Sequence, residues 1–199
     1  MSYDSAQDGL ILALRLIAES EIGALVDTGE VSVVASTKGY PAPLESIEQM
    51  RLPCMCIYVP SETNVRTGQR VDTRCEVTFE YILPATPLAK LDLRWPILRA
   101  VWAAVVKSVR IGKAKGRDVL TDVGVIDIEH DQASAKYSFA SGGEDAYPVF
   151  VGTLRITQRP VTDMPTQEFL SLLADVNRVE PDANASIQPQ VQVLAVSET

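Results

Sequence analysis

The stretch RVDTRCEVTFEYIL, Arg70 to Leu83, decides the fold because its apolar and charged residues alternate with a period of two. Such alternation predicts a β-strand with one apolar face and one polar face. At ~3.3 Å per residue, the strand from Val71 to Leu83 would span roughly 43 Å, whereas most strands have about 5 or 6 residues. We therefore predict a long strand that crosses the core and extends beyond it. Its apolar face consists of Val71, Cys75, Val77, Phe79, Tyr81 and Leu83.

Two amphipathic helices are predicted, one on each side of this strand in the sequence. The first runs from Ser5, its expected N-cap, to about Val26, with apolar residues at roughly helical spacing. The second begins near Asp92, which can cap it, tolerates Pro96 in its first turn and ends at about Ile111, before a glycine. The expected core stripe of the second helix is Leu98, Val101, Trp102, Val105 and Val109.

The other strands are predicted from short apolar or alternating runs, which are EVSVVAS (30–36), PCMCIYV (53–59), VGVIDIEH (123–130), AKYSFA (135–140) and PVFVGTLRIT (148–157). The prolines of segment 37–53 indicate a long excursion with one helical turn. We expect PSETNVRTGQR (60–70) to be a loop, DIEHDQAS (127–134) to contain a turn and SGGEDAY (141–147) to be a flexible connection. PTQEFLSLLADV (165–176) is predicted to be a short third helix.

These elements predict an α+β fold, with a mostly antiparallel mixed sheet flanked by two main helices. We expect one ring-forming domain over residues 1–176 and an extended C-terminal arm over residues 177–199. A chain of 199 residues with 46% hydrophobic and 22% charged residues is long and apolar enough for a globular core. The acidic start and the interruption of GLILALRLIA by Arg15 argue against a signal peptide or a membrane span, so we expect a soluble intracellular protein.

The sequence supports no catalytic or metal site. His130 is the only histidine, and we expect it in a solvated turn. The sequence has no Gly-x-Ser-x-Gly or comparable motif that would place a nucleophile beside it. Cys54, Cys56 and Cys75 could join His130 in a zinc site, but Cys-x-Cys within a strand lacks the turn of a zinc knuckle. We therefore expect three reduced core cysteines, no metal, no cofactor and no enzymatic activity.

Charge is distributed unevenly along the chain. The segment 94–117 holds seven of the 18 Lys and Arg residues and none of the 26 Asp and Glu residues, in a protein of net charge −8. This segment can be a solvated helix flank, a patch that meets an acidic face of another copy, or a small nucleic-acid contact. The net negative charge argues against general nucleic-acid binding.

The polar face of the long strand is expected to form a salt-linked surface ladder rather than an acid/base pair. With the basic segment and the C-terminal arm it supplies the predicted subunit interface. The predicted interface residues are Asp72, Arg74, Glu76, Glu80, Arg94, Arg99, Lys107, Arg110, Val191 and Val193.

In the order of its parts, the chain resembles the tail terminator, or tail completion, proteins of long-tailed bacteriophages. The resemblance covers about Ser5 to Pro160 and lies in DGLILALRLIA, RVDTRCEVTFEYIL and LRWPILRAVWAAVV. It implies a small subunit of a ring, usually a homo-hexamer, that caps the tail tube and joins it to the head-side connector. The implied partners are other copies, the tail-tube protein and a connector or neck protein, with no membrane and with DNA only passing through the ring lumen.

The same resemblance implies a location in the tail or neck of the virion after assembly in the host cytoplasm, and it brings no catalytic residue. Another connector, neck or tail-tube subunit shares these features. A stand-alone ligand-binding or enzymatic α+β domain is the other reading, with its pocket near the His130 turn or the SGGED loop.

The C-terminal stretch NASIQPQVQVLAVSET departs from the resemblance. Its prolines prevent a helix, yet QVQVLAV alternates well enough to add as a strand to an adjacent subunit, with Val191, Val193 and Ala195 facing inward. The alternative on composition is a disordered polar tail.

Overall fold

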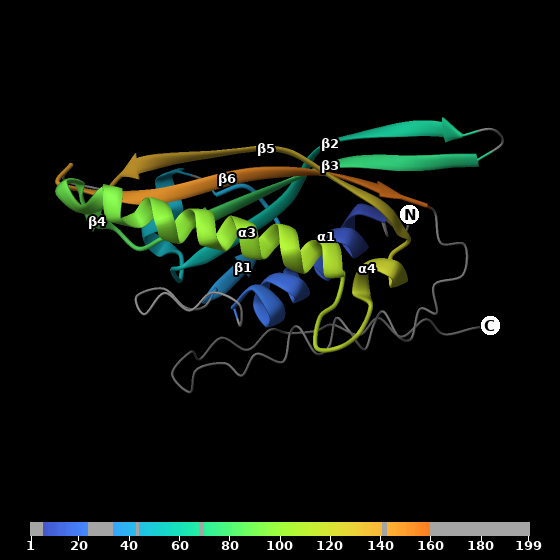
Figure 1. The fold of residues 1–199 in the computed structure, drawn as a ribbon. Helices are drawn as coiled ribbons and strands as arrows, with labels where there is room; N and C mark the ends of the chain where they lie inside the picture. The colour runs from blue at the N-terminus through green and yellow to red at the C-terminus, as the bar shows by residue number, and fades with distance from the viewer. Residues whose placement is uncertain (1–5, 24–33, 43, 68–69, 141–142, 160–199) are drawn as a thin grey trace, which may run out of the picture. The chain divides into compact units, whose positions relative to one another are not determined.

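The computed structural model describes residues 6–23, 34–42, 44–67, 70–140 and 143–159, which all belong to the first of two units of the chain, Met1–Asp163. Figure 1 shows a sheet with helices packed against it. The helical elements are α1 (Ala6–Ile17), the π-helix η1 (Ala18–Ile22), the 3-10 helices η2 (Leu44–Gln49) and η3 (Leu88–Arg94), α3 (Trp95–Ile111) and α4 (Val119–Asp122). The strands are β1 (Ser36–Lys38), β2 (Cys54–Thr67), β3 (Arg70–Ile82), β4 (Thr86–Pro87), β5 (Val125–Phe139) and β6 (Asp145–Gln158).

The sheet has six strands in the order β1-β2-β3-β6, with β5 on the other side of β6. Only β1 and β2 run parallel, and every other pair is antiparallel. Ala146 of β6 pairs with Thr86 of β4 and with Phe139 of β5, so these two strands lie on opposite sides of β6, and β4 continues the ladder of β3. The predicted α+β fold with a mostly antiparallel mixed sheet is confirmed.

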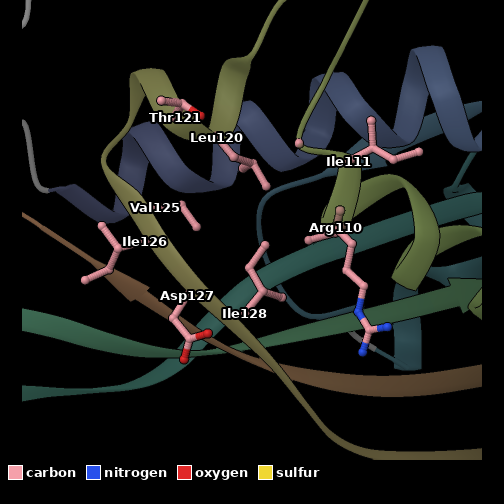
Figure 2. A pocket seen from close by; sticks show the side chains of 10 residues that line it. Arg110, Ile111, Leu120, Thr121, Val125, Ile126, Asp127 and Ile128 are labelled. Carbon is pink, nitrogen blue, oxygen red and sulfur yellow. The ribbon is translucent and has the colours of Figure 1, made fainter.

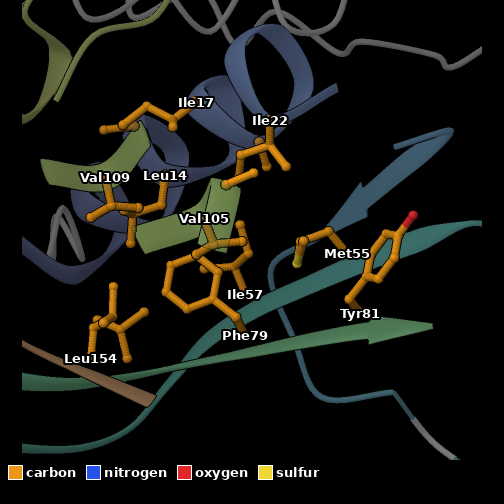
Figure 3. Packing of buried hydrophobic residues seen from close by; sticks show 14 of the residues in the cluster. Leu14, Ile17, Ile22, Met55, Ile57, Phe79, Tyr81, Val105, Val109 and Leu154 are labelled. Carbon is orange, nitrogen blue, oxygen red and sulfur yellow. The ribbon is translucent and has the colours of Figure 1, made fainter. Parts of the chain in front are cut away.

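The long strand predicted from RVDTRCEVTFEYIL is β3, and its apolar face covers the main core. Cys75, Val77, Phe79, Tyr81 and Leu83 are buried in one cluster with residues of α1 and α3. Figure 3 shows Leu14 of α1 and Val105 of α3 directed toward Phe79. Val71 is the exception, with 46% of its surface exposed, because it lies near the start of β3, outside the core cluster.

The opposite face of the sheet is covered by a smaller cluster. Cys54, Cys56, Ile82 and Val149 pack there with Ile47 of η2, the helical turn predicted for segment 37–53. Since neighbouring residues of a strand point to opposite faces, Met55 lies in the main core between two cysteines of the smaller cluster. One face of the sheet is therefore covered by α1 and α3, and the other face by η2.

Two loop predictions are wrong because these segments are strands with mostly polar side chains. Residues 60–67 continue β2, which pairs with β3 as far as Thr67 opposite Arg70 (Figure 1). Because β6 also pairs with residues 73–76 of β3, only residues 65–67 and 70–72 form a two-stranded end. The segment DIEHDQAS lies inside β5, which is one strand of 15 residues instead of two strands and a turn. Most side chains of both segments are exposed, so neither segment has the apolar alternation that marks a half-buried strand.

The second predicted helix ends correctly but begins late. α3 ends at Ile111, and Gly112 adopts φ 70° while its N–H donates to Ser108 O at 3.0 Å. Asp92 does not cap α3, because it lies within η3, and the N-cap residue is Arg94, which makes no side-chain cap hydrogen bond. Pro96 stands in the first turn as predicted.

Other predictions fall partly or wholly outside the described residues. The first predicted helix is present from Ala6 to Gly23, while its expected cap Ser5 and its end at Val26 are not described. The strand predicted at 30–36 begins only at Ser36 within the described part. The third helix at 165–176, the domain boundary at residue 176 and the arm at 177–199 all lie outside the described residues.

Candidate assembly surfaces

The outer side of α3 carries a row of cations, here called the basic ridge: Arg99, Lys107 and Arg110. All three are exposed, because the apolar stripe of α3 (Leu98, Val101, Val105 and Val109) is buried against the sheet and Trp102 is half-buried. None of the three forms an ion pair with another residue in the described ranges. Exposed Ala103 lies between Arg99 and Lys107, so the ridge has little bulk there.

Three other residues of the basic segment make contacts within their own chain. Arg94 is half-buried, and its Nε donates a hydrogen bond to Thr86 Oγ1 at 3.3 Å. Lys113 Nζ lies 3.8 Å from Asp118 Oδ1, and the backbone N–H of Lys115 donates to Glu21 Oε1 at 3.1 Å. Of the four predicted basic interface residues, the structure therefore groups three on one surface and places Arg94 apart.

The salt-linked surface ladder predicted along the polar face of β3 is wrong. Asp72 is buried and pairs with Arg159, whose Nε lies 3.4 Å from Asp72 Oδ1. Glu80 is also buried. Arg74 is exposed, and half-buried Glu76 accepts a hydrogen bond from Ser61 Oγ at 2.8 Å. The two buried carboxylates thus pair with cations of other segments, Arg159 after β6 and Lys136 of β5, instead of with Arg74.

Glu80 is held at the edge of a pocket on the η2 side of the sheet. Its Oε2 accepts a hydrogen bond from the backbone N–H of Ala42 at 3.0 Å, and its Oε1 lies 3.5 Å from Lys136 Nζ. Burial, together with the negative charge of Glu80, raises the pKa of Tyr58 to about 12. The Glu80 pocket has a volume of about 260 Å³. It is lined by Ala42, Ile47, Glu80, Ile82, Lys136, Tyr137, Ser138 and Val149.

A second pocket, of about 310 Å³, lies where α3 ends and β5 begins. Figure 2 shows Leu120 of α4 and Ile128 of β5 pointing toward each other across it. Arg110 and Asp127 supply its charges, and exposed Ile111 and Ile126 add apolar surface. Neither of the two pockets is lined by His130 or by the SGGED loop. The alternative hypothesis of a ligand-binding domain predicts a pocket at one of these two places.

β5 leaves a long edge of the sheet open within the described part of the chain, since its only described partner is β6. Near its end, Tyr137 and Phe139 are 50% and 62% exposed and form an edge-to-face pair with ring centroids 5.6 Å apart. Open edges and exposed aromatic residues are features by which proteins associate.

His130 has a structural partner that the sequence does not reveal. It stands on β5 beside a register shift, where the Nε1–H of Trp102 donates to its Nε2 at 3.2 Å. The contact joins residues 28 positions apart, so no local pattern indicates it. His130 is exposed as predicted, but it lies in a strand and not in a turn.

The three cysteines are free and buried, as predicted. Cys54 and Cys56 belong to the cluster beside η2, with their Sγ atoms 4.0 Å apart, whereas Cys75 belongs to the main core on the other face of the sheet. They therefore cannot converge on one zinc ion with His130. Burial raises the pKa of the Cys75 thiol to about 11, which keeps it protonated near neutral pH. Among the described residues, no group of three or more His, Cys, Asp or Glu side chains could hold a metal ion.

No helix in the described ranges is long and apolar enough to cross a membrane. No protein-family model matches the chain, and no curated protein sequence matches it. Among solved structures, the chain is similar to one from the virion of a native gene transfer agent particle, with 16% sequence identity and a TM-score of 0.39. The similarity covers 78% of this chain and 99% of that chain.

Proposed function

We propose that the chain is a structural subunit of a bacteriophage-type virion, a tail terminator that joins copies of itself into a ring. The observation that carries this proposal is the basic ridge, whose three cations have no ion-pair partner in the described part of a chain with net charge −8. A cationic surface on an acidic protein favours association with an acidic surface of another copy. Contact between two unlike surfaces is heterologous, and heterologous contacts close into rings when the rotation allows it.

The arrangement of the elements supports this function. The order on which the resemblance to tail terminators rests is a helix, two strands, one very long strand, a second helix and meander strands. The described residues contain α1, β1, β2, the long strand β3, α3 and the antiparallel strands β5 and β6 in that order. The chemistry of the described residues also fits a structural role. His130 bonds to Trp102, and the carboxylates of Asp72 and Glu80 are in ion pairs.

In finer terms we propose a homo-hexamer that sits on the last ring of the tail tube and offers a docking surface to the head-side connector. The subunit needs no cofactor for this, and DNA passes through the lumen of the ring. Assembly takes place in the host cytoplasm, and the finished ring resides at the neck of the virion. Binding of the ring to the end of purified tail tubes, as seen by electron microscopy, separates a terminator from a neck, connector or tube subunit.

The first experiment measures the mass of the purified protein by light scattering after size exclusion, alone and with purified tail tubes. We expect rings or tube-bound rings that weaken as salt rises, because exposed charges are screened over a Debye length of about 8 Å at physiological ionic strength. The double variant Arg99→Glu with Lys107→Glu should lose association and keep its circular dichroism spectrum. The matched control is Lys90→Glu with Arg117→Glu, which makes the same charge change at exposed residues off the ridge.

The proposal is contradicted if the wild-type protein stays a monomer in both conditions. It is equally contradicted if the ridge variant and the control variant assemble alike at every salt concentration.

A further inference from the structure

Glu80 is a buried carboxylate with spare binding capacity. It is only 7% exposed, which makes an incompletely paired negative charge costly. Its one ion-pair partner among the described residues, Lys136, lies at 3.5 Å and has a side chain that is 54% exposed, so the pair is long and partly solvated. The backbone N–H of Ala42 donates to Oε2, and the hydroxyl of Tyr58 also hydrogen-bonds to the carboxylate. Since the two oxygens of a carboxylate offer about four acceptor sites, Glu80 can accept one further donor.

The walls of the Glu80 pocket suit an aliphatic stem that ends in a cation. Ala42, Ile47, Ile82 and Val149 supply apolar surface, and the carboxylate supplies the only negative charge among the described lining residues. Lysine and arginine side chains bury their methylene stems along apolar surface while the charged group reaches a polar partner. The volume of about 260 Å³ lies below the range of about 300 to 1,000 Å³ found for pockets of drug-sized ligands. The pocket therefore fits one side chain better than a metabolite.

The protein itself carries the matching cations, on the other face of its sheet. The α3 helix packs on the face of Val77 and Phe79, while Glu80 and Ile82 point to the face covered by η2. The basic ridge and the Glu80 pocket thus lie on opposite sides of the sheet, and a ridge cation cannot enter the pocket of its own copy. Two unlike surfaces on opposite sides are what a head-to-tail contact between copies requires.

We propose that the Glu80 pocket receives a cationic side chain, Arg99 or Lys107, from the basic ridge of a second copy of this chain. The inference rests on the proposed self-association and names the residue contact that carries it. The small side chain of Ala103 lets the ridge approach the rim of the pocket. The incoming cation displaces the exposed ammonium group of Lys136 and gives the buried carboxylate a desolvated partner. Such close pairs across an interface act mainly on dissociation.

Two substitutions give opposite results under this proposal. Glu80→Gln keeps the shape and an acceptor for the N–H of Ala42 but removes the charge, so the dissociation constant between copies should rise about 30-fold or more. Lys136→Met removes the competing internal cation, so association should be equal to or tighter than that of the wild type. If Lys136→Met weakens association as much as Glu80→Gln does, the ion pair only supports the fold and the proposal is wrong.

Ridge variants identify the incoming residue without touching the core. Arg99→Ala and Lys107→Ala are each measured with and without Glu80→Gln, by light scattering at fixed salt, with thermal unfolding of the monomer as the folding control. We expect one of them to lose its effect when Glu80 is already Gln, which is the signature of a direct contact in a double-mutant cycle. The proposal is overturned if the effects of Arg99→Ala and of Lys107→Ala on the dissociation constant both add fully to that of Glu80→Gln.

A cross-link gives a readout that does not depend on the stability of Glu80→Gln. Under mild oxidation, Lys107→Cys or Arg99→Cys combined with Ser138→Cys on the pocket lining should form disulfide-linked ladders, whereas Lys90→Cys combined with Ser138→Cys should not. The pocket contact is overturned, and the proposed function is left intact, if rings form normally, Glu80→Gln does not change their stability and no disulfide-linked ladder appears. A wild-type protein that never associates, with or without tail tubes, would overturn both.

Discussion

At Gly152 of β6, the absence of a side chain makes room for Trp102. The indole lies against this residue, with its ring centroid 5.6 Å from that of Phe150 and 6.2 Å from that of Phe79. A Cβ atom added at Gly152 would come closer to three atoms of the indole than real Cβ atoms approach anything. A glycine inside a strand often marks such a close approach.

We therefore expect Gly152→Ala to lower the free energy of unfolding by about 1 to 3 kcal/mol, the usual cost of overpacking a core. Urea unfolding followed by circular dichroism measures this change. Trp102→Ala alone should cost about 3 kcal/mol, the low end for a tryptophan because the residue is half-buried. In the Trp102→Ala background the cost of Gly152→Ala should largely vanish. An equal cost in both backgrounds would mean that the indole is not what Gly152 accommodates.

At the scale of elements, a single glycine, Gly112, ends the helix α3. Gly112 has φ 70°, a left-handed conformation that glycine adopts without strain, and its N–H donates to Ser108 O. A Cβ there would meet Leu120 Cβ at 3.4 Å, an ordinary contact. The backbone alone therefore sets the cost, and we expect Gly112→Ala to destabilise the protein by about 1 kcal/mol.

Gly112→Asn is the matched variant, because asparagine tolerates the left-handed region better than alanine does. Its loss in denaturant melts should be smaller than that of Gly112→Ala. The reverse ranking would show that contact with Leu120, and not backbone strain, sets the cost.

Elements were predicted correctly from the sequence where neighbouring residues determine the structure, and incorrectly where contacts between distant residues determine it. The end of α3 and the long strand β3 were predicted correctly because a glycine after a helix and a period of two are local signals. The polar parts of β2 and β5 could not be predicted as strands from the sequence, because their side chains are exposed on both faces and main-chain pairing with β3 and β6 determines them. The burial of Glu80 could not be predicted from local sequence either, because it results from contacts with Ala42 and Lys136, which are distant in sequence.

At the scale of the whole molecule, the sheet separates two surfaces of opposite character. The helix side presents the basic ridge, and the other side presents a pocket with a buried carboxylate. A single copy cannot bring its own ridge to its own pocket, whereas the proposed ring would place the ridge of each copy on the pocket of the next. The open edge of β5 adds a third surface, to which a strand of another chain can add through main-chain hydrogen bonds.

The C-terminal stretch is the segment of this chain suited to strand addition, because QVQVLAV alternates and would place Val191 and Val193 on one face. We expect deletion of Asn184 to Thr199 to leave the circular dichroism spectrum and the melting temperature of the isolated subunit unchanged. The rings or their attachment to tail tubes should become less stable, as measured by light scattering and by dissociation in rising salt. The full-length variant Val191→Ser with Val193→Ser is the matched control for chain length, and it should show the same loss because it removes only the apolar face of the strand. If the truncated subunit assembles as well as the full chain, these sixteen residues are a solvated polar tail and association rests on the ridge and the pocket alone.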